Sequence, residues 1–336
     1  MLAVGFSSGL ISDPLRSNWD ETDARPIWWS AWYPVPRQSA GLGAGISPPA
    51  GIFVSEPVCN VSAETGARRL PVVVFSHGTG GAVASMSWLA HRLARAGYLT
   101  IGIDHHGNTA REPYCAEGFL CWWERSRDLS VALDFHLSKG PFSRIADGDR
   151  IYAAGFSLGG YTVVCSLGAI TELSRFHNWA RDMPFGKGPR EFPDLVNHIA
   201  ALLERNRAFR LSYERQSASF RDDRIRAGFL CAPAPTVRAF EEESLQVIQR
   251  SVAITVGQAD REAPVEECAA WLAKRLPNSE LKLIGEQVGH YVFLDQCTAL
   301  GQSLEPEICV DPPGIDRRHL HDEVAAHAVG FFNNQA

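Results

Sequence analysis

The sequence lacks several features that would place a protein in a class at once. It has no hydrophobic run near the ~18 residues that a membrane-spanning helix needs, so we expect no membrane span. It has no long block of like charge and its formal net charge is −6, which excludes a strongly basic nucleic-acid surface. It has no internal repeat and no CxxC pair among its eight cysteines, so we expect neither a zinc site nor a thioredoxin-like site.

Signals for cofactors and for export are also missing. Gly41-x-Gly43 does not complete the G-x-G-x-x-G of a dinucleotide site, because Ile46 stands where the last glycine belongs. His105 and His106 have no third donor at ligand spacing, so we expect no metal and no cofactor. The first residues lack the basic region of a secretory signal. We therefore expect a cytoplasmic protein, or a secreted or periplasmic one if a leader has been removed.

Cysteine is present at a level too low for a disulfide scaffold, with eight cysteines in 336 residues. Cys115 and Cys121 are close enough in sequence to pair in an oxidising compartment, and so are Cys297 and Cys309. The sequence by itself leaves both pairings open.

What the sequence does contain is a regular alternation of strands and helices. Its hydrophobic content of 45% and charged content of 21% are typical of a soluble globular protein with a sizeable core. Continuous apolar runs that alternate with helical periodicity predict a mostly parallel, doubly wound α/β sheet, with residues 1–336 in a single domain. We predict strands over 70–75, 98–103, 151–156, 227–232, 251–256 and 281–284, and helices over 85–96, 124–138, 161–170, 240–250, 264–276 and 316–332.

The run from Ile151 to Gly160 predicts a strand, a tight turn and a helix. Within it, Gly155-Phe-Ser157-Leu-Gly159 fits the pattern G-x-S-x-G. In the nucleophile elbow of the α/β-hydrolases such a turn strains the serine backbone and holds its hydroxyl above the end of a parallel sheet. The alternative is a glycine-rich turn that only packs a helix on a sheet. We predict that Ser157 is a catalytic nucleophile.

A second match to the pattern occurs near the N-terminus, at residues 5–9 (Gly-Phe-Ser-Ser-Gly). No buried strand precedes it and Ser-Asp-Pro follows at 12–14, so we predict a loop without catalytic function. Residues 27–33 are β-prone and are bounded by Pro26 and Pro34, which predicts an early edge strand.

Residues 171–225 interrupt the alternation with many arginines and no strand-like run, while residues 195–210 have helical periodicity. Ligands in open α/β sheets bind beyond the carboxyl ends of the strands, so we predict that this insertion is a helical lid over that edge. The alternative is a peripheral helical excursion with no part in binding. Its arginines alternate with acids, which favours a solvated face over an anion site.

A serine nucleophile needs a base, and the base needs a group that fixes its tautomer and orientation. In α/β-hydrolases the chain order is nucleophile, acid, histidine, and Ser157, Asp260 and His290 follow that order. Each of the three comes directly after a predicted strand, so all are expected at one edge of the sheet. Glu262 and Asp295 are alternative acids, but the turn at 257–259 favours Asp260.

The oxyanion of a tetrahedral intermediate needs two backbone N–H donors fixed in advance. One is expected from Leu158, the residue after the nucleophile. The other is expected from the loop His77-Gly-Thr-Gly-Gly81, where Thr79 is our choice. The alternative for this loop is a plain glycine-rich turn.

Five segments together resemble a known family. They are D-H-H-G-N-T at 104–109, H-G-T-G-G at 77–81, G-F-S-L-G-G at 155–160, G-Q-A-D-x-x-x-P at 257–264 and G-H-x-x-F-L-D-x-C at 289–297. Over residues 26–336 the chain resembles the bacterial predicted dienelactone hydrolases, a group similar to the platelet-activating-factor acetylhydrolases.

The resemblance implies a serine hydrolase of carboxylic esters, with Ser157, Asp260 and His290 as catalytic triad. It also implies Thr79 and Leu158 as oxyanion donors and a pairing of Cys297 with Cys309. True dienelactone hydrolases have a cysteine where this chain has Ser157, so that substrate is not inferred.

The sequence therefore predicts an α/β-hydrolase fold and a small-molecule ester as substrate, cleaved through an acyl-enzyme. An amidase, peptidase or lactonase would use the same triad. A hydrolase-fold protein that binds a ligand without turnover is the alternative of another class. The sequence does not indicate an oligomeric state.

Overall fold

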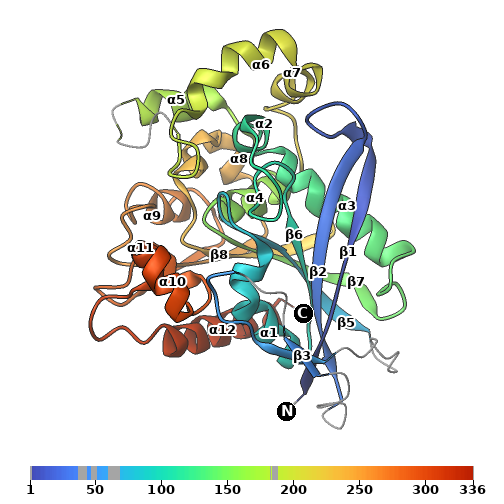
Figure 1. Cartoon of the computed structure of the whole chain (residues 1–336), viewed down its shortest axis with the longest axis vertical. Helices are drawn as coiled ribbons and strands as arrows, with labels where there is room; N and C mark the ends of the chain where they lie inside the picture. Colours follow the sequence, from blue (N-terminus) through green and yellow to red (C-terminus); the bar gives the residue numbers. More distant parts are fainter. Residues whose placement is uncertain are drawn as a thin grey trace.

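A computed structural model describes residues 2–36, 44–46, 51–59, 69–181, 183 and 188–335. Within these ranges ten strands form one sheet, in the order β10-β9-β8-β7-β5-β6-β2-β1-β4-β3. Helices cover both faces of the sheet (Figure 1). The prediction of a mostly parallel, doubly wound α/β fold is confirmed.

The six strands from β5 to β10 pair in parallel and form the centre of the sheet. Val72, Val73 and Val74 have no exposed surface, as expected for a strand covered by helices on both faces. Because the strands are parallel, the loops after them meet at one edge of the sheet. The strands are β5 (Leu70–Ser76), β6 (Leu99–Asp104), β7 (Ala146–Phe156), β8 (Ile225–Cys231), β9 (Ser251–Gly257) and β10 (Ser279–Ile284).

Four long helices form the two outer layers. On one face α1 (Ser87–Arg95) packs against α12 (Arg317–Asn333), and on the other α3 (Glu124–Ser138) packs against α4 (Leu158–Leu167) (Figure 1). The helix predicted over 124–138 has those bounds. Short helical segments complete the layers: η2 (Val83–Met86), α2 (Ala116–Leu120), η4 (Pro235–Ala239), α8 (Glu242–Gln246), α9 (Ala269–Ala273), η5 (His290–Phe293), α10 (Ala299–Leu304) and α11 (Pro306–Cys309).

Two predictions about the N-terminal segment were wrong. β2 (Ala24–Val35) lies between β1 (Ala3–Ser17) and β6, so it is an interior strand and not an edge strand. Pro26 and Pro34 are tolerated because β6 pairs only with residues 28–32 of β2. Residues 5–9 lie within β1 and do not form a loop. Beyond β1 the sheet ends with β4 (Pro57–Cys59) and β3 (Ala44–Ile46).

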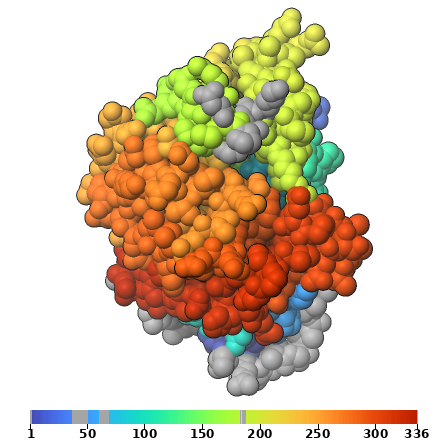
Figure 2. Space-filling view, turned by 90° about the vertical axis from the view of Figure 1, so that its left-hand side faces the viewer, coloured from blue at the N-terminus to red at the C-terminus, as the bar shows by residue number. Residues whose placement is uncertain are grey.

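The insertion at 171–225 contains α5 (Leu173–Ala180), η3 (Leu195–His198), α6 (Ile199–Arg205) and α7 (Arg207–Glu214). The periodic segment 195–210 is divided because the backbone of Asn206 is extended and its side chain caps α7. The insertion lies beyond one end of the sheet (Figure 1), and in Figure 2 it borders a hollow together with the C-terminal third of the chain. No helix in the described ranges is long and apolar enough to cross a membrane.

Candidate active site

Ser157 lies at the turn between β7 and α4, with φ of +54° and ψ of −117°. A positive φ is costly for a residue with a side chain, so the surrounding structure must impose it. A Cβ atom at Gly155 would lie 2.2 Å from the carbonyl oxygen of Gly159, and one at Gly159 would lie 2.0 Å from that of Ser76. The two glycines are therefore needed for the close approach of β7, α4 and β5. The turn has the strand, sharp bend and helix of a nucleophile elbow.

His290 is brought to this turn by the loop that follows β10. Its Nε2 atom lies 3.0 Å from Ser157 Oγ, and its Nδ1 atom lies 2.7 Å from Asp260 Oδ2. Residues separated by 133 positions of the chain are thus joined in one hydrogen-bonded line. With Nδ1–H donated to the carboxylate, Nε2 is left as the acceptor that faces the serine hydroxyl.

Asp260 follows β9, and its carboxylate is held at both oxygens. Oδ1 accepts the backbone N–H of Ala263 at 2.7 Å, while Oδ2 faces His290. A Cβ atom at Gly257 would lie 2.2 Å from the carbonyl oxygen of Val288, so Gly257 allows the loops that carry the acid and the histidine to touch. The structure therefore places Asp260, as predicted from the turn, beside the imidazole.

The two alternative acids are placed elsewhere. Glu262 is exposed to solvent. Asp295 is buried, but its carboxylate accepts the backbone N–H groups of Ser87 and Trp88 and the Ser87 hydroxyl. Neither makes a hydrogen bond to His290.

The charge state of His290 is set by two opposed effects. Burial by itself lowers the pKa of the imidazole, but the charge and hydrogen bond of the Asp260 carboxylate, with smaller charge effects of Glu262 and Glu191, outweigh it, so the net pKa is raised above its ordinary value. Because His290 is 7% exposed and Asp260 is 5% exposed, water screens this interaction little. The arrangement favours an imidazole that accepts a proton readily.

The loop between β5 and η2 lies against the serine. A Cβ atom at Gly78 would lie 3.3 Å from Ser157 Cβ, so the backbone that leads into Thr79 passes beside the nucleophile. The Gly80 N–H is fixed by Asn108 Oδ1 at 2.6 Å. Leu158 is the first residue of α4, so its N–H has no acceptor within the helix. The assignment of Thr79 and Leu158 as oxyanion donors stays a prediction.

Sequence reasoning missed Arg125, which donates a hydrogen bond to the loop at 77–81. Its guanidinium is buried and Nη2 donates to the carbonyl oxygen of His77, while Nε and Nη1 have no partner in the described structure. Burial lowers the pKa of Arg125 to about 9, so the group is still a cation at neutral pH. The sequence did contain a signal, because Arg125 lies four positions before Leu129 on the predicted apolar stripe of its helix.

A second buried group connects this loop to the N-terminal hairpin. His105 lies between Ser76 Oγ, at 2.9 Å, and Asp128 Oδ2, at 3.0 Å. Asp128 in turn accepts Arg16 at 2.6 Å and Arg25 at 2.8 Å. Burial would raise the pKa of Asp128, but the two guanidiniums hold it well below its ordinary value. The strand ends beside Ser157 are therefore fixed by charge-assisted hydrogen bonds.

The insertion reaches the same loop. A Cβ atom at Gly80 would lie 2.7 Å from Glu191 Cγ, and Phe192 packs against Phe119 with ring centres 5.5 Å apart. Tyr114, which lies beneath, donates its hydroxyl to the Gly80 carbonyl at 2.5 Å. The loop beside the serine is thus contacted both by the core and by the insertion.

Of the two cysteine pairs left open by the sequence, one is bonded. Cys297 and Cys309 form a disulfide, whereas Cys115 and Cys121 are free thiols. The disulfide joins the segment after η5 to α11, so it anchors the chain seven residues after His290.

Comparisons with known proteins agree with this architecture. Residues 53–119 match the family described as "Platelet-activating factor acetylhydrolase, isoform II"; the match includes the Gly78 loop but not Ser157, Asp260 or His290. No curated protein is similar enough in sequence to be matched. Among solved structures, a ferulic acid esterase from Streptomyces cinnamoneus superposes with a TM-score of 0.66 at 16% identity, covering 99% of this chain and 90% of the esterase.

The sequence identity to that esterase is low, so the likeness establishes the fold and not the substrate. The parallel sheet, the strained serine turn and the partial family match agree with one another. The chain has an α/β-hydrolase fold, and residues 53–119 are similar to the acetylhydrolase family.

Proposed function

We propose that this protein is a serine hydrolase that cleaves carboxylic esters through an acyl-enzyme, with Ser157, His290 and Asp260 as catalytic triad. One observation carries the proposal. Ser157 Oγ, His290 and Asp260 form one hydrogen-bonded line, with distances of 3.0 Å and 2.7 Å, at a serine whose backbone has a φ of +54°. A strained serine that serves only packing has no need of a buried histidine and carboxylate in line with it.

The geometry suggests the following steps. His290 Nε2 takes the proton of Ser157 Oγ as that oxygen attacks the ester carbonyl, and Asp260 stabilises the imidazolium that forms. The N–H groups of Leu158 and Thr79 stabilise the oxyanion, each by ~3 kcal/mol. The intermediate collapses as His290 gives its proton to the leaving alcohol. Water, activated by the same histidine, then releases the carboxylic acid and restores Ser157.

The preference for an ester over an amide rests on the comparisons. Both named relatives, an acetylhydrolase and a ferulic acid esterase, cleave ester bonds by their descriptions. An amidase, peptidase or lactonase on the same triad remains the second candidate. We also propose that the insertion at 171–225 is a lid, because Glu191 within it contacts the loop beside Ser157.

A series of p-nitrophenyl esters of rising acyl length, with matching p-nitroanilides, tests the proposal. We expect ester turnover that exceeds anilide turnover, and a loss of about 10⁴-fold or more in Ser157→Ala. Ser7→Ala is the matched control, because Ser7 belongs to the other G-x-S-x-G match and lies in β1. Turnover of anilides as fast as esters would favour the amidase.

The ligand-binding alternative makes the opposite forecast. A folded protein that hydrolyses none of these substrates, yet binds the uncleaved ester, would be a carrier that uses the hydrolase fold. Equal residual activity in Ser157→Ala and in the unmodified chain would also remove Ser157 from the mechanism.

A further inference from the structure

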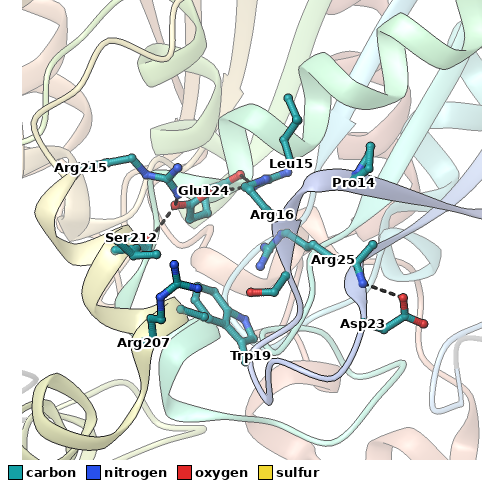
Figure 3. Close-up of a pocket in the computed structure, with 14 residues that line it drawn as sticks. Pro14, Leu15, Arg16, Trp19, Asp23, Arg25, Glu124, Arg207, Ser212 and Arg215 are labelled. Atoms are coloured by element: carbon teal, nitrogen blue, oxygen red, sulfur yellow. Dashed lines mark hydrogen bonds and ion pairs between the residues drawn. The ribbon is translucent and has the colours of Figure 1, made fainter.

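A cavity lies away from the candidate active site, between the β1–β2 hairpin and the insertion at 171–225. It is open to solvent on one side, has a volume of ≈ 480 Å³, and none of Ser157, Asp260, His290 or the Gly78 loop lines it. This volume is in the range of small-molecule sites. Its walls come from the β1–β2 hairpin, from the start of α3 and from α7 (Figure 3).

Four arginines line this cavity, and two of them are fixed. Arg16 and Arg25 are held by ion pairs to the buried Asp128, at 2.6 Å and 2.8 Å. Arg16 also pairs with Asp13 and Glu124. These guanidiniums form a rigid inner wall whose charges are already matched.

The carboxylate at the centre of the wall has no capacity left for a cation. Glu124 Oε1 accepts the Ser212 hydroxyl at 2.6 Å and Arg215 at 2.7 Å, and Oε2 accepts Arg16 at 2.9 Å. The other acid of the lining, Asp23, is exposed and accepts the Ala24 N–H. A bound cation would therefore find the Glu124 carboxylate already paired and, among the described lining residues, could meet only the exposed Asp23.

Donors, in contrast, are available. The side chain of Arg207 makes no hydrogen bond and no ion pair with any residue in the described ranges, and it extends from α7 toward the cavity (Figure 3). Arg215 uses Nη2 on Glu124. Glu21, the remaining nearby acid, accepts the backbone N–H groups of Arg207 and Ala208 and does not pair with the Arg207 guanidinium. The open donors thus belong to two arginines of the insertion.

Apolar side chains flank these donors. Leu15 is 80% exposed and Leu211 is 43% exposed, and both line the cavity with the buried Trp19. Exposed leucines beside the unpaired guanidinium of Arg207 and the partly used one of Arg215 suit a ligand that has an apolar body and an anionic head.

We propose that this cavity binds a small amphiphilic carboxylate. The carboxylate lies on Arg207 and Arg215, and the apolar body lies on Leu15 and Leu211. Inorganic phosphate fits less well, because it has no apolar body to lie on Leu15 and Leu211. This site does not depend on the proposed ester hydrolysis.

Occupation of the site would join α7 to the hairpin. Asn206, at the start of α7, already donates to the Trp19 carbonyl at 2.8 Å, so the two elements are in contact without ligand. A ligand that binds both elements only in the folded protein raises the melting temperature by mass action.

Titration calorimetry with 4-phenylbutyrate tests the proposal. The neutral 4-phenyl-1-butanol and inorganic phosphate serve as comparison ligands. The protein is first treated with a fluorophosphonate to block Ser157; if Ser157 does not react, which bears on the proposed function alone, the untreated protein is titrated. We expect one site for 4-phenylbutyrate and affinities at least about tenfold weaker for the alcohol and for phosphate.

Two exposed arginines make a matched pair of variants. We expect Arg207→Ala to weaken 4-phenylbutyrate binding about tenfold or more, and Arg205→Ala, which lies outside the cavity, to change it less than about twofold. Leu15→Ser should weaken the binding of 4-phenylbutyrate but leave the binding of phosphate unchanged. The proposal is overturned if no probe binds, if Arg207→Ala binds as tightly as the unmodified chain, or if phosphate or the alcohol binds as tightly as the carboxylate.

Discussion

At the scale of single residues, the site depends on how His290 is charged and aimed. Asp260 affects both the orientation and the charge of His290. Its Oδ2 atom lies 2.7 Å from Nδ1, and its charge raises the pKa of the imidazole against the effect of burial. The free imidazole is the form that can accept the serine proton. In the proposed mechanism the Asp260 carboxylate therefore moves the active pH range upward while it orients the base.

This arrangement predicts a pH effect of Asp260→Asn. In the unmodified protein, kcat/KM should rise with pH and level off above an inflection that lies higher than the ordinary histidine pKa near ~6.5. In the variant the inflection should move to lower pH, because burial is then opposed only by the smaller charge effects of Glu262 and Glu191, and the plateau should fall by about 10³-fold or more. Glu262→Gln is the matched control: Glu262 is exposed and makes no hydrogen bond to His290, so removal of its smaller charge effect should move the inflection less and leave the plateau nearly unchanged. An unmoved inflection would contradict the assigned role of Asp260.

Arg125 gives a second prediction at this scale. Arg125→Met removes the donor to the His77 carbonyl, so the proposed oxyanion loop is less well held and kcat should fall roughly tenfold to a hundredfold with little change in KM. Stability should change little, because two guanidinium nitrogens are buried without partners and Asp128 keeps Arg16 and Arg25. Chemical denaturation and steady-state kinetics measure the two effects separately.

Arg127→Met is the control for this change, because Arg127 lies on the same helix with its side chain 39% exposed. A loss of stability with unchanged kcat would show that Arg125 serves the fold and not the loop.

At the scale of elements, the disulfide fixes the C-terminal side of the site. Cys297 and Cys309 close a loop of 12 residues that follows η5. In the chain-entropy account a loop of this size stabilises by about 3 kcal/mol. We expect Cys297→Ser to lower the free energy of unfolding by about that amount, while Cys115→Ser, at a free thiol, has a much smaller effect. Urea denaturation of both variants under non-reducing conditions checks this, and equal effects would argue against a stabilising bond.

The elements also show how far the sequence could be followed. The central strands and α3 were predicted because their apolar periodicity is strong and local. The interior position of β2 was not predicted, because it depends on pairing with β1 and β6, and because the flanking prolines suggested an edge strand. The helices predicted over 240–250 and 264–276 are shorter in the structure, as α8 and α9. Turns replace their ends, and some backbone groups there bond to other loops, as the Glu241 N–H does to the Ile170 carbonyl.

The site was partly predictable for a related reason. Ser157, Asp260 and His290 each follow a strand, so chain order and the parallel sheet were enough to bring them to one edge. Chain order does not explain why His290 Nε2 lies 3.0 Å from Ser157 Oγ. That distance depends on the close packing of Gly257 against Val288 and of Gly155 against Gly159. The contact of Arg125 with the His77 loop and the cavity around Arg207 were not predicted, because both depend on contacts between distant segments of the chain.

At the scale of the whole molecule, a buried acid makes stability depend on pH. Burial raises the pKa of Asp295 to about 7, although Ser87 and Trp88 donate to it. The folded protein therefore holds this proton more tightly than the unfolded chain does. The stabilisation of the folded state by the protonated Asp295 is fully present below the unfolded pKa of 3.8 and is lost as pH rises through about 7.

Asp295→Asn tests this, because an amide resembles the neutral acid at all pH values. The free energy of unfolding of the unmodified protein should fall between pH 3.8 and about 7 more steeply than that of the variant. Urea denaturation at several pH values gives both slopes. Parallel curves would mean that Asp295 is equally ionised in the folded and unfolded states.

The central claim is that Ser157 is a nucleophile activated by His290, and covalent labelling tests it most directly. The folded protein is treated with a fluorophosphonate and the adduct is located by peptide mass. The account predicts one adduct on Ser157, absent in Ser157→Ala and formed far more slowly in His290→Ala. An unreactive folded protein, or an adduct that persists in Ser157→Ala, would contradict it.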